Sequence, residues 1–510
     1  MPQTESTAAN NKRIAKNTIA LYIRMIILMF VALYTSRVVL QTLGVEDFGV
    51  YNVVGGLVVM FSFLKNAMTT SVQRFLNFEL GKNDLQAATN IFSASLVIHI
   101  IIALLIIVLG ETIGVWFLNT YLDIPQDRIH AANWCLQFTI FATAINIICS
   151  PYNAAIISYE RMSFYAYTSI AEAILKLGTI FMIIYIEFDK LVLYSAFMFV
   201  VPIIMTIIYV IYCRVNFSIC RFKINNSKEL YQNLIGFSGW SLFGSIADVF
   251  SIHGISIIFN IFGGVVFNAA MGIANQIVNT VYSFVSNFQI AFRPQIVKTY
   301  ANGAINDFQN LVFRASRFSF YLLLIMTVPY LIGADLILAL WLETPPEFAA
   351  DFSRLLLLYL LIDAMSAPLW MSAQAIGDIR NYQLIISFNI LLIIPTAIVL
   401  LSLGYSPIAV LVAKVFINFT CHVTRLLYLR KKISFPTKQY IIDVMKPIAT
   451  VSAAIFVISY PLNKYFDGSS IITLIKMIIA FGVSVIAIYL FGITQQEKDY
   501  LLRFIRIKHQ

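Results

Sequence analysis

The chain has 510 residues, of which 60% are hydrophobic and 12% are charged, about half the charged fraction of a soluble globular protein. A water-soluble fold cannot cover so much apolar surface with so few charges, which excludes an ordinary soluble enzyme, a disordered chain and a fibrous protein. The net charge of +10 therefore indicates a charge difference between the two sides of a membrane rather than a surface for nucleic acid.

Apolar runs of membrane-spanning length recur along the whole chain. A bilayer core about 30 Å thick needs roughly 20 apolar helical residues, and this criterion predicts an all-α polytopic membrane protein with about 14 transmembrane helices. The predicted spans lie near 15–41, 48–70, 90–117, 131–156, 166–186, 190–213, 232–260, 264–290, 318–342, 352–375, 382–404, 406–424, 443–462 and 471–492. The run 318–342 is expected to leave the membrane near Gly333 and to continue as a short interfacial helix.

The distribution of Lys and Arg orients these spans. With the N-terminus in the cytoplasm, 24 basic residues fall in cytoplasmic segments, 4 in outside loops and 7 within spans. Because cytoplasmic loops of membrane proteins are enriched in Lys and Arg, we expect an even number of spans, with both termini in the cytoplasm.

The two halves of the chain resemble each other. Matching residues recur 219 positions apart: Leu43-Gly44 with Phe262-Gly263, Phe48 with Phe267, Arg74 with Arg293, and Arg161 with Arg380. Six spans per half keep both halves in one orientation, related by a pseudo-two-fold axis along the membrane normal. We therefore predict an N-terminal six-helix lobe over 1–225, a C-terminal six-helix lobe over 226–432, and two extra transmembrane helices with a cytoplasmic tail over 433–510.

The first predicted outside loop carries a glycine motif, Leu43-Gly44-Val45-Glu46-Asp47-Phe48-Gly49-Val50-Tyr51. It resembles the LG-x-x-x-[FY]-G-x-Y signature of the bacterial polysaccharide transporters, the O-antigen (Wzx-type) flippases of the multidrug/oligosaccharidyl-lipid/polysaccharide exporter superfamily. Asp248 in mid-helix also looks like this family, whereas Asn268 and Ala270 depart from the signature in the second copy of the loop. The resemblance covers essentially the whole chain and implies a MATE-like fold.

The resemblance also implies a function. A flippase of this family moves an oligosaccharide on an undecaprenyl diphosphate carrier across the bacterial inner membrane by alternating access, for the synthesis of surface polysaccharide such as lipopolysaccharide O-antigen. The diphosphate and sugars need a wet, cationic cavity, because they would lose their hydration in hydrocarbon. We expect no catalytic residue, no metal and no cofactor, with transport driven by the membrane potential or an ion gradient. The expected partners are the lipid-linked oligosaccharide, the lipid bilayer and polysaccharide assembly proteins, without nucleic acid.

Charged residues within spans are the candidate site residues, because each costs roughly 2.5–3.5 kcal/mol at the bilayer centre. The candidates for binding the anionic headgroup are Arg24, Arg37, Lys65, Lys176 and Lys414. Arg37 and Lys65 lie near span ends, where snorkelling to the interface is the alternative. Lys176 has a structural alternative, an ion pair with Glu172 one helical turn earlier.

Three carboxylates within spans, Asp248, Glu172 and Asp363, are candidates for coupling transport to an ion gradient. A buried carboxylate can bind a cation or a proton, although a structural hydrogen bond or salt bridge is the alternative. Four arginines at repeat-equivalent cytoplasmic ends could gate the inner side or act only as charged loop anchors. They are Arg74, Arg293, Arg161 and Arg380.

Two other functions remain open. A cation-coupled multidrug exporter predicts a cavity lined by carboxylates and aromatic side chains, whereas the charge within these spans is more basic than acidic. A membrane-embedded glycosyltransferase or ligase usually carries its catalytic residues on a large soluble loop, and the longest loops here are about 25 residues. The sequence favours the flippase.

Overall fold

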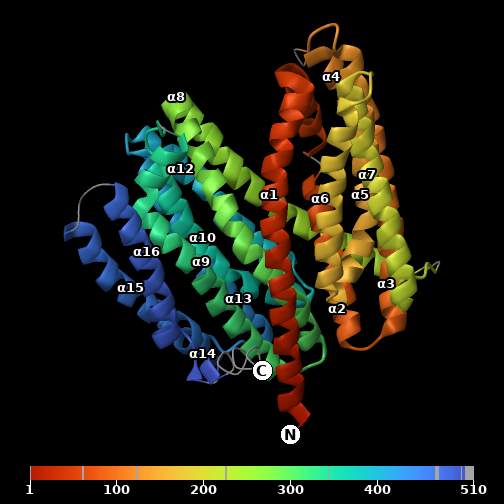
Figure 1. Ribbon diagram of the computed structural model, residues 1–510. Helices are drawn as coiled ribbons and strands as arrows, with labels where there is room; N and C mark the ends of the chain where they lie inside the picture. The colour runs from red at the N-terminus through yellow and green to blue at the C-terminus, as the bar shows by residue number, and fades with distance from the viewer. Residues whose placement is uncertain are drawn as a thin grey trace, which may run out of the picture. The chain divides into compact units, whose positions relative to one another are not determined.

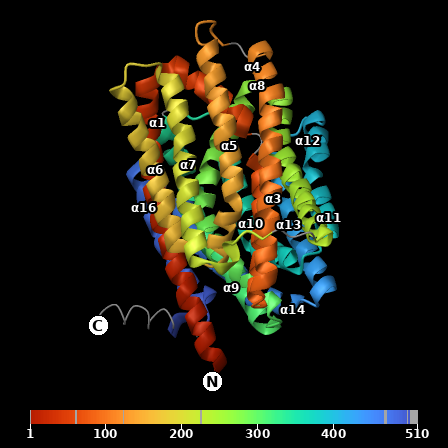
Figure 2. The ribbon, with the colours of Figure 1, turned by 90° about the vertical axis from the view of Figure 1, so that its right-hand side faces the viewer.

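The computed structural model describes residues 2–59, 62–121, 124–223, 227–342, 344–465, 470–495 and 497–499. These residues are almost entirely helical and contain no strand (Figure 1, Figure 2). Among them, 11 helices are long and apolar enough to cross a membrane. The chain is an all-α, multi-pass membrane protein, which confirms the predicted fold class.

The chain divides into two compact units, each of which is described separately. The first lobe comprises residues 1–245 and 297–303, and the second lobe comprises residues 246–296 and 304–510. One helix, α8 (Lys228–Ala301), contributes to both, since its two ends belong to the first lobe and its middle to the second.

The first lobe starts with α1 (Pro2–Val59), which is broken at Gly44. The positive φ of 79° at this position favours glycine, so the first glycine of the motif marks the end of the first predicted span. The remaining helices of this lobe are α2 (Ser62–Gly81), α3 (Leu85–Leu109), a π-helical turn (Gly110–Gly114), α4 (Val115–Tyr121), α5 (Ile129–Ser158), α6 (Met162–Ile184) and α7 (Lys190–Asn216).

Short-range sequence signals start several helices. Asp84 caps α3, where its carboxylate accepts from the Ala87 N–H at 2.8 Å, and Asp189 caps α7 through the Val192 N–H at 3.0 Å. Such side chains satisfy a backbone donor that the first helical turn leaves free. In the first lobe, α5 lies beside α7 and α3, and α1 lies beside α6 (Figure 1).

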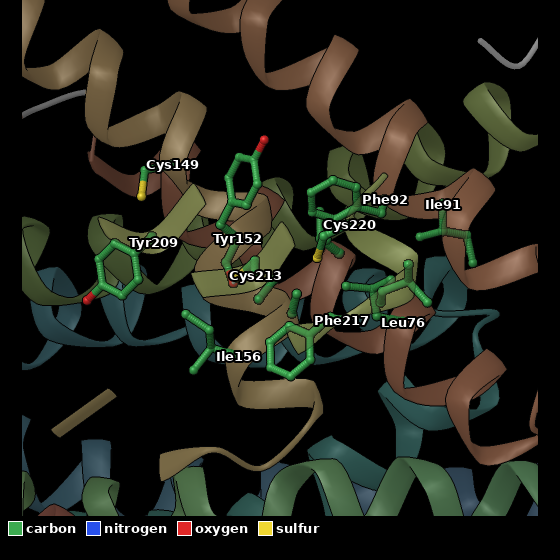
Figure 3. Close-up of a cluster of buried hydrophobic side chains, with 14 of the residues drawn as sticks. Leu76, Ile91, Phe92, Cys149, Tyr152, Ile156, Tyr209, Cys213, Phe217 and Cys220 are labelled. Carbon is green, nitrogen blue, oxygen red and sulfur yellow. The ribbon is translucent and has the colours of Figure 1, made fainter. Parts of the chain in front are cut away.

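Apolar side chains from α2, α3, α5 and α7 form the main core of the first lobe. Figure 3 shows the side chains of Phe92 and Tyr152 close together, and their ring centroids lie 5.1 Å apart in an edge-to-face arrangement. Leu76, Cys213 and Phe217 are buried in the same cluster. Burial of these residues fixes the four helices against one another, since apolar area removed from water stabilises the fold.

The second lobe contains the middle of α8 and the helices that follow it. The predicted spans 232–260 and 264–290 both lie within the helical segment α8. The chain folds back between them, because Asp248 interacts electrostatically with Tyr282, whereas a straight α-helix would separate these residues by about 51 Å. The next helix, α9, departs from helical geometry at Gly333 (φ −103°, ψ 15°) and continues to Leu342. The sequence predicted a break at this residue, and the interfacial position of the following segment stays a prediction. The helices of this lobe after α8 are α9 (Ile305–Leu342), α10 (Ala349–Ile376), α11 (Arg380–Leu391), α12 (Ile393–Ser402), α13 (Pro407–Ile433), α14 (Thr437–Tyr440), α15 (Lys446–Tyr465) and α16 (Ser470–Ala487), with π-helical turns at Ile441–Met445 and Ile488–Gly492.

The helix boundaries repeat along the chain. The start of α5 at Ile129 corresponds to the start of α10 at Ala349, and the start of α7 at Lys190 corresponds to the start of α13 at Pro407. Between them, α6 corresponds in the same way to α11 and α12. These boundaries recur at nearly the offset that separates the matching sequence motifs, so the repeat is also present in the order and length of the helices.

The last two membrane-length helices pack on the second lobe. α16 lies along α9, and the Met477 side chain occupies the space that a Cβ at Gly333 would fill. Beyond α16, Glu497 accepts from Arg317 of α9 at 2.7 Å and lies 3.2 Å from Arg314. Both Arg317 and Glu497 are buried, so this ion pair fastens the end of the described chain to α9.

Candidate functional site

A stripe of buried polar residues runs along one face of α13. Lys414, Asn418, His422 and Arg425 follow one another at intervals of three or four residues, the spacing that places side chains on one helical face. Each of them is at most 6% exposed. Charged residues inside a membrane helix cost free energy on insertion. Their presence here therefore indicates a function or a set of partners that compensates for this cost.

The partners of this stripe come from α10 and α11 of the same lobe. The Asn418 amide donates to the Tyr359 carbonyl at 2.9 Å, and the Lys414 ammonium lies 5.1 Å from the centroid of the Tyr359 ring. His422 Nδ1 lies 2.7 Å from the Ser366 hydroxyl, and Arg425 Nε donates to the Tyr382 hydroxyl at 3.2 Å.

Two carboxylates complete the cluster. Asp248 of α8 interacts electrostatically with Asp363 of α10 and with both Lys414 and Arg425 of α13. We call this cluster of Asp248, Tyr359, Asp363, Lys414, His422 and Arg425 the polar seam. The Asp248 side chain is exposed and that of Asp363 is half-buried, whereas the two cations are buried.

The charges of the polar seam are close but not in contact. Among the described residues, none of the four charged groups forms an ion pair within 4.0 Å. Arg425 Nη1 and His422 Nε2 are buried and have no hydrogen-bond partner. Arg425 Nη1 is a donor, and leaving a buried donor without a partner costs about 1–3 kcal/mol, so the seam retains capacity to bind one further acceptor.

Arg293 of α8 lies against the same helix, α10. Its guanidinium is 5.3 Å from the centroid of the Trp370 ring and donates to the Gln374 side chain at 2.9 Å. Among the described residues, Arg293 of α8 is thus a further cation beside α10, in addition to Lys414 and Arg425 of α13.

In the first lobe, the candidate charges have different surroundings. Arg24 of α1 lies 4.7 Å from the centroid of the Tyr165 ring, and its Nε is buried without a hydrogen-bond partner. Lys176 and Glu172 of α6 form an ion pair at 2.6 Å, which is the structural alternative that the sequence suggested. The side chains of Arg37 and Lys65, also candidates, lie outside the described residues.

The four repeat-equivalent arginines separate into two kinds. Arg74 is buried, with its guanidinium 4.6 Å from the ring centroids of both Phe75 and Phe78, and Arg293 is held by Trp370 and Gln374 as described. Arg161 and Arg380, at the starts of α6 and α11, are exposed. The structure thus places the first pair inside their lobes and the second pair at helix starts.

The sequence analysis missed Arg425, Tyr359 and His422 as site residues. Arg425 was counted with a cytoplasmic loop because the predicted span ended at 424, but α13 continues to Ile433. Basic residues at the end of an apolar run look like the flank of a span, so hydropathy alone ends the helix too early. The helical spacing of Lys414, Asn418, His422 and Arg425 was the available signal.

A second charged cluster lies outside the membrane-spanning helices of the first lobe. Arg128, just before α5, donates to both oxygens of Asp47 at 2.7 and 2.6 Å and to Asp189 at 2.7 Å. Burial disfavours the charged form of Asp189, but the Val192 N–H and Arg128 outweigh this effect and lower the pKa of Asp189 below its ordinary value. This cluster ties the glycine motif to the starts of α5 and α7.

No group of three or more His, Cys, Asp or Glu side chains that could hold a metal ion occurs among the described residues. The five cysteines are free and buried.

Comparison with known proteins identifies the fold. No protein family model matches the chain, and no curated protein matches it by sequence. Among solved structures, a point mutant of a MATE transporter matches with a TM-score of 0.73 at 15% identity, covering 83% of this chain and 96% of that one. An outward-facing multidrug resistance MATE family transporter of the MOP superfamily matches with a TM-score of 0.72 at 14% identity and the same coverage.

A third match is a MOP superfamily transporter from Pyrococcus furiosus, described as having a binding pocket of reverse polarity that suggests a different function. Its TM-score is 0.71 at 14% identity, covering 83% of this chain and 96% of that one. The described chain therefore has the fold of the MATE transporters of the MOP superfamily.

Proposed function

We propose that this protein is a flippase that translocates a lipid-linked oligosaccharide, on an isoprenyl diphosphate carrier, across the bacterial inner membrane by alternating access. Both termini then lie in the cytoplasm, and the protein acts as a transporter rather than an enzyme. The fold of the MATE transporters supports a transport function, although fold alone does not specify the cargo.

The observation that carries the proposal is the sign of the intramembrane charge. Arg24 in the first lobe and Lys414 and Arg425 in the second are cations on membrane helices without an ion pair within 4.0 Å among the described residues. A diphosphate is recognised by such groups, because N–H donors with positive charge form strong hydrogen bonds to its oxygens. Cations held inside membrane helices therefore fit an anionic cargo.

A cation-coupled multidrug exporter is the second candidate. It is favoured by the exposed Asp248 carboxylate, the half-buried Asp363 and the neighbouring Tyr359 ring, which together could bind an organic cation. The matched MATE structures are compatible with either cargo.

Complementation of a deletion strain separates the two candidates. We expect the wild-type gene to restore surface polysaccharide, and Lys414→Gln and Arg425→Gln to lose most of this activity at equal protein level. Lys446→Gln is the matched control, because Lys446 is exposed at the start of α15 and should retain activity. Restoration of ethidium resistance, with surface polysaccharide unaffected by the deletion, would support the exporter and overturn the flippase.

A further inference from the structure

The polar seam is confined to the second lobe. At the repeat-equivalent positions, the first lobe has Ile140, Ala144, Ser195 and Thr206 in place of Tyr359, Asp363, Lys414 and Arg425. The two lobes share helix boundaries but not these charges. The seam is therefore an addition to the repeat and not a requirement of its packing.

The anions and cations of the seam differ in their exposure. Asp248 is exposed and Asp363 half-buried, whereas Lys414 and Arg425 are each 6% exposed. Asp248 interacts electrostatically with both cations and Asp363 interacts with Arg425, and such attraction strengthens where water is partly excluded. While both carboxyls are ionised, they neutralise the two cations and reduce their attraction for any other anion.

We propose that the two carboxylates of the polar seam are resident competitors of the cargo's diphosphate, and that a proton decides which anion the seam cations face. This inference rests on the proposed function and names the regulation of the same site. A proton transferred from hydronium forms an O–H bond on one carboxylate and leaves a water molecule, and the cation that this carboxylate had neutralised becomes available to the phosphate. Loss of the proton restores the resident anion and expels the diphosphate.

One observation besides the pair of carboxylates points to a bound acceptor. Arg425 Nη1 is buried without a hydrogen-bond partner, although its Nε already donates to Tyr382. His422 Nε2 does not add to this donor, because the Ser366 hydroxyl donates to the Ile362 carbonyl and therefore accepts from His422 Nδ1, which leaves Nε2 as an acceptor. Arg425 lies on the same face of α13 as Lys414, so the seam has an N–H donor that no described residue satisfies.

Every element packed around the carboxylates contributes groups that the pH can affect. They are Tyr282 of α8, Tyr359 of α10, Tyr382 of α11, and Lys414, Cys421, His422 and Arg425 of α13. A tyrosine, cysteine, lysine or arginine ordinarily titrates above neutral pH. The carboxyls and His422 are thus the groups to test in the acidic range.

Proton and diphosphate binding are then positively linked, because each favours the state in which the other binds. Such linkage loads the cargo together with a proton and releases both together. In this scheme the two carboxylates bind the coupling proton.

The experiment measures binding of farnesyl diphosphate to the purified full chain by titration calorimetry, at about pH 8 and about pH 5.5. We expect wild-type affinity to rise on the order of tenfold at the lower pH. Asp248→Asn and Asp363→Asn should bind more tightly than wild type at the higher pH and respond less to acid. The diphosphate of the ligand also changes its protonation between these two pH values, and this contributes equally to wild type and to the variants. The difference in pH response between wild type and the variants therefore measures the contribution of the two carboxyls.

Asp335→Asn is the matched control, since Asp335 is an exposed carboxylate of the same lobe that pairs with Arg354; it should behave as wild type. His422→Gln should keep the pH response if the carboxyls carry it. Farnesyl diphosphate binding that ignores both pH and the two Asp→Asn changes would overturn this inference and leave the flippase intact. Failure of wild type and both variants to bind the diphosphate at either pH would overturn the proposed function as well.

Discussion

The Arg128 cluster gives a prediction whose size follows from the structure. Replacing Arg128 with Ala removes three short charge-assisted hydrogen bonds, two to Asp47 and one to Asp189, and leaves these carboxylates facing each other. The side chains of Arg128, Asp47 and Asp189 are 21%, 15% and 30% exposed. A hydrogen bond to a charged group contributes about 1.5–3 kcal/mol, and screening at this exposure reduces the sum. We expect a loss of about 2–3 kcal/mol in the free energy of unfolding.

Thermal unfolding in detergent, followed by intrinsic fluorescence, measures this loss as a lower Tm. Arg354→Ala is the matched control in the second lobe, because Arg354 also contacts two aspartates, but Asp335 is 74% and Asp351 50% exposed. We expect the control to cost less than about 1 kcal/mol. Equal losses for the two variants would refute the reasoning that burial sets the strength of these clusters.

The same cluster predicts a pH dependence. The folded pKa of Asp189 is lowered, so its stabilising contribution is complete above the unfolded value of about 3.9 and disappears as the pH falls through the folded value. Wild-type Tm should therefore fall more steeply in acid than that of Arg128→Ala. Parallel acid profiles would show that Arg128 does not hold the Asp189 charge.

Two further predictions concern ion pairs at other ends of the lobes. Lys298→Met should destabilise the protein by about 2–4 kcal/mol, because Glu160, whose side chain is 1% exposed, loses an ammonium 2.8 Å away. The double variant Lys298→Met with Glu160→Gln should recover part of the Tm. If it recovers none, the two side chains do not form a direct pair. Glu497→Gln should make the end of the chain more accessible to protease, because it weakens the pairs with Arg317 and Arg314; protease resistance equal to wild type would show that other contacts hold this segment.

The fold could be predicted largely from two regular signals. The length of the apolar runs indicated the helices, and the recurrence of Arg74 and Arg161 at Arg293 and Arg380 indicated the repeat that the helix boundaries share. Gly333 was a recognisable position for a break because Asp335 interrupts the apolar run just after it. The two spans within α8 were also predicted from their apolar runs, although hydropathy does not show that helical geometry extends from one to the other.

The candidate site could be predicted only in part. The pair of Glu172 and Lys176 follows from its spacing, and Lys414 and Asp248 stand out as charges in apolar runs. Their association with Asp363 and Arg425 depends on which faces of α8, α10 and α13 meet in the second lobe. That choice is made by packing between helices far apart in the chain, for which a single sequence contains no direct signal.

The most direct test of the account is translocation in proteoliposomes that contain only this protein. The probe is an isoprenyl diphosphate linked to an NBD-labelled sugar, and dithionite reports which leaflet it occupies. The account predicts that wild type moves the probe, that Lys414→Gln and Arg425→Gln slow it on the order of tenfold or more, and that Lys446→Gln does not. Probe movement equal to that in empty liposomes, together with ethidium transport by the same preparation, would contradict an anionic lipid-linked cargo.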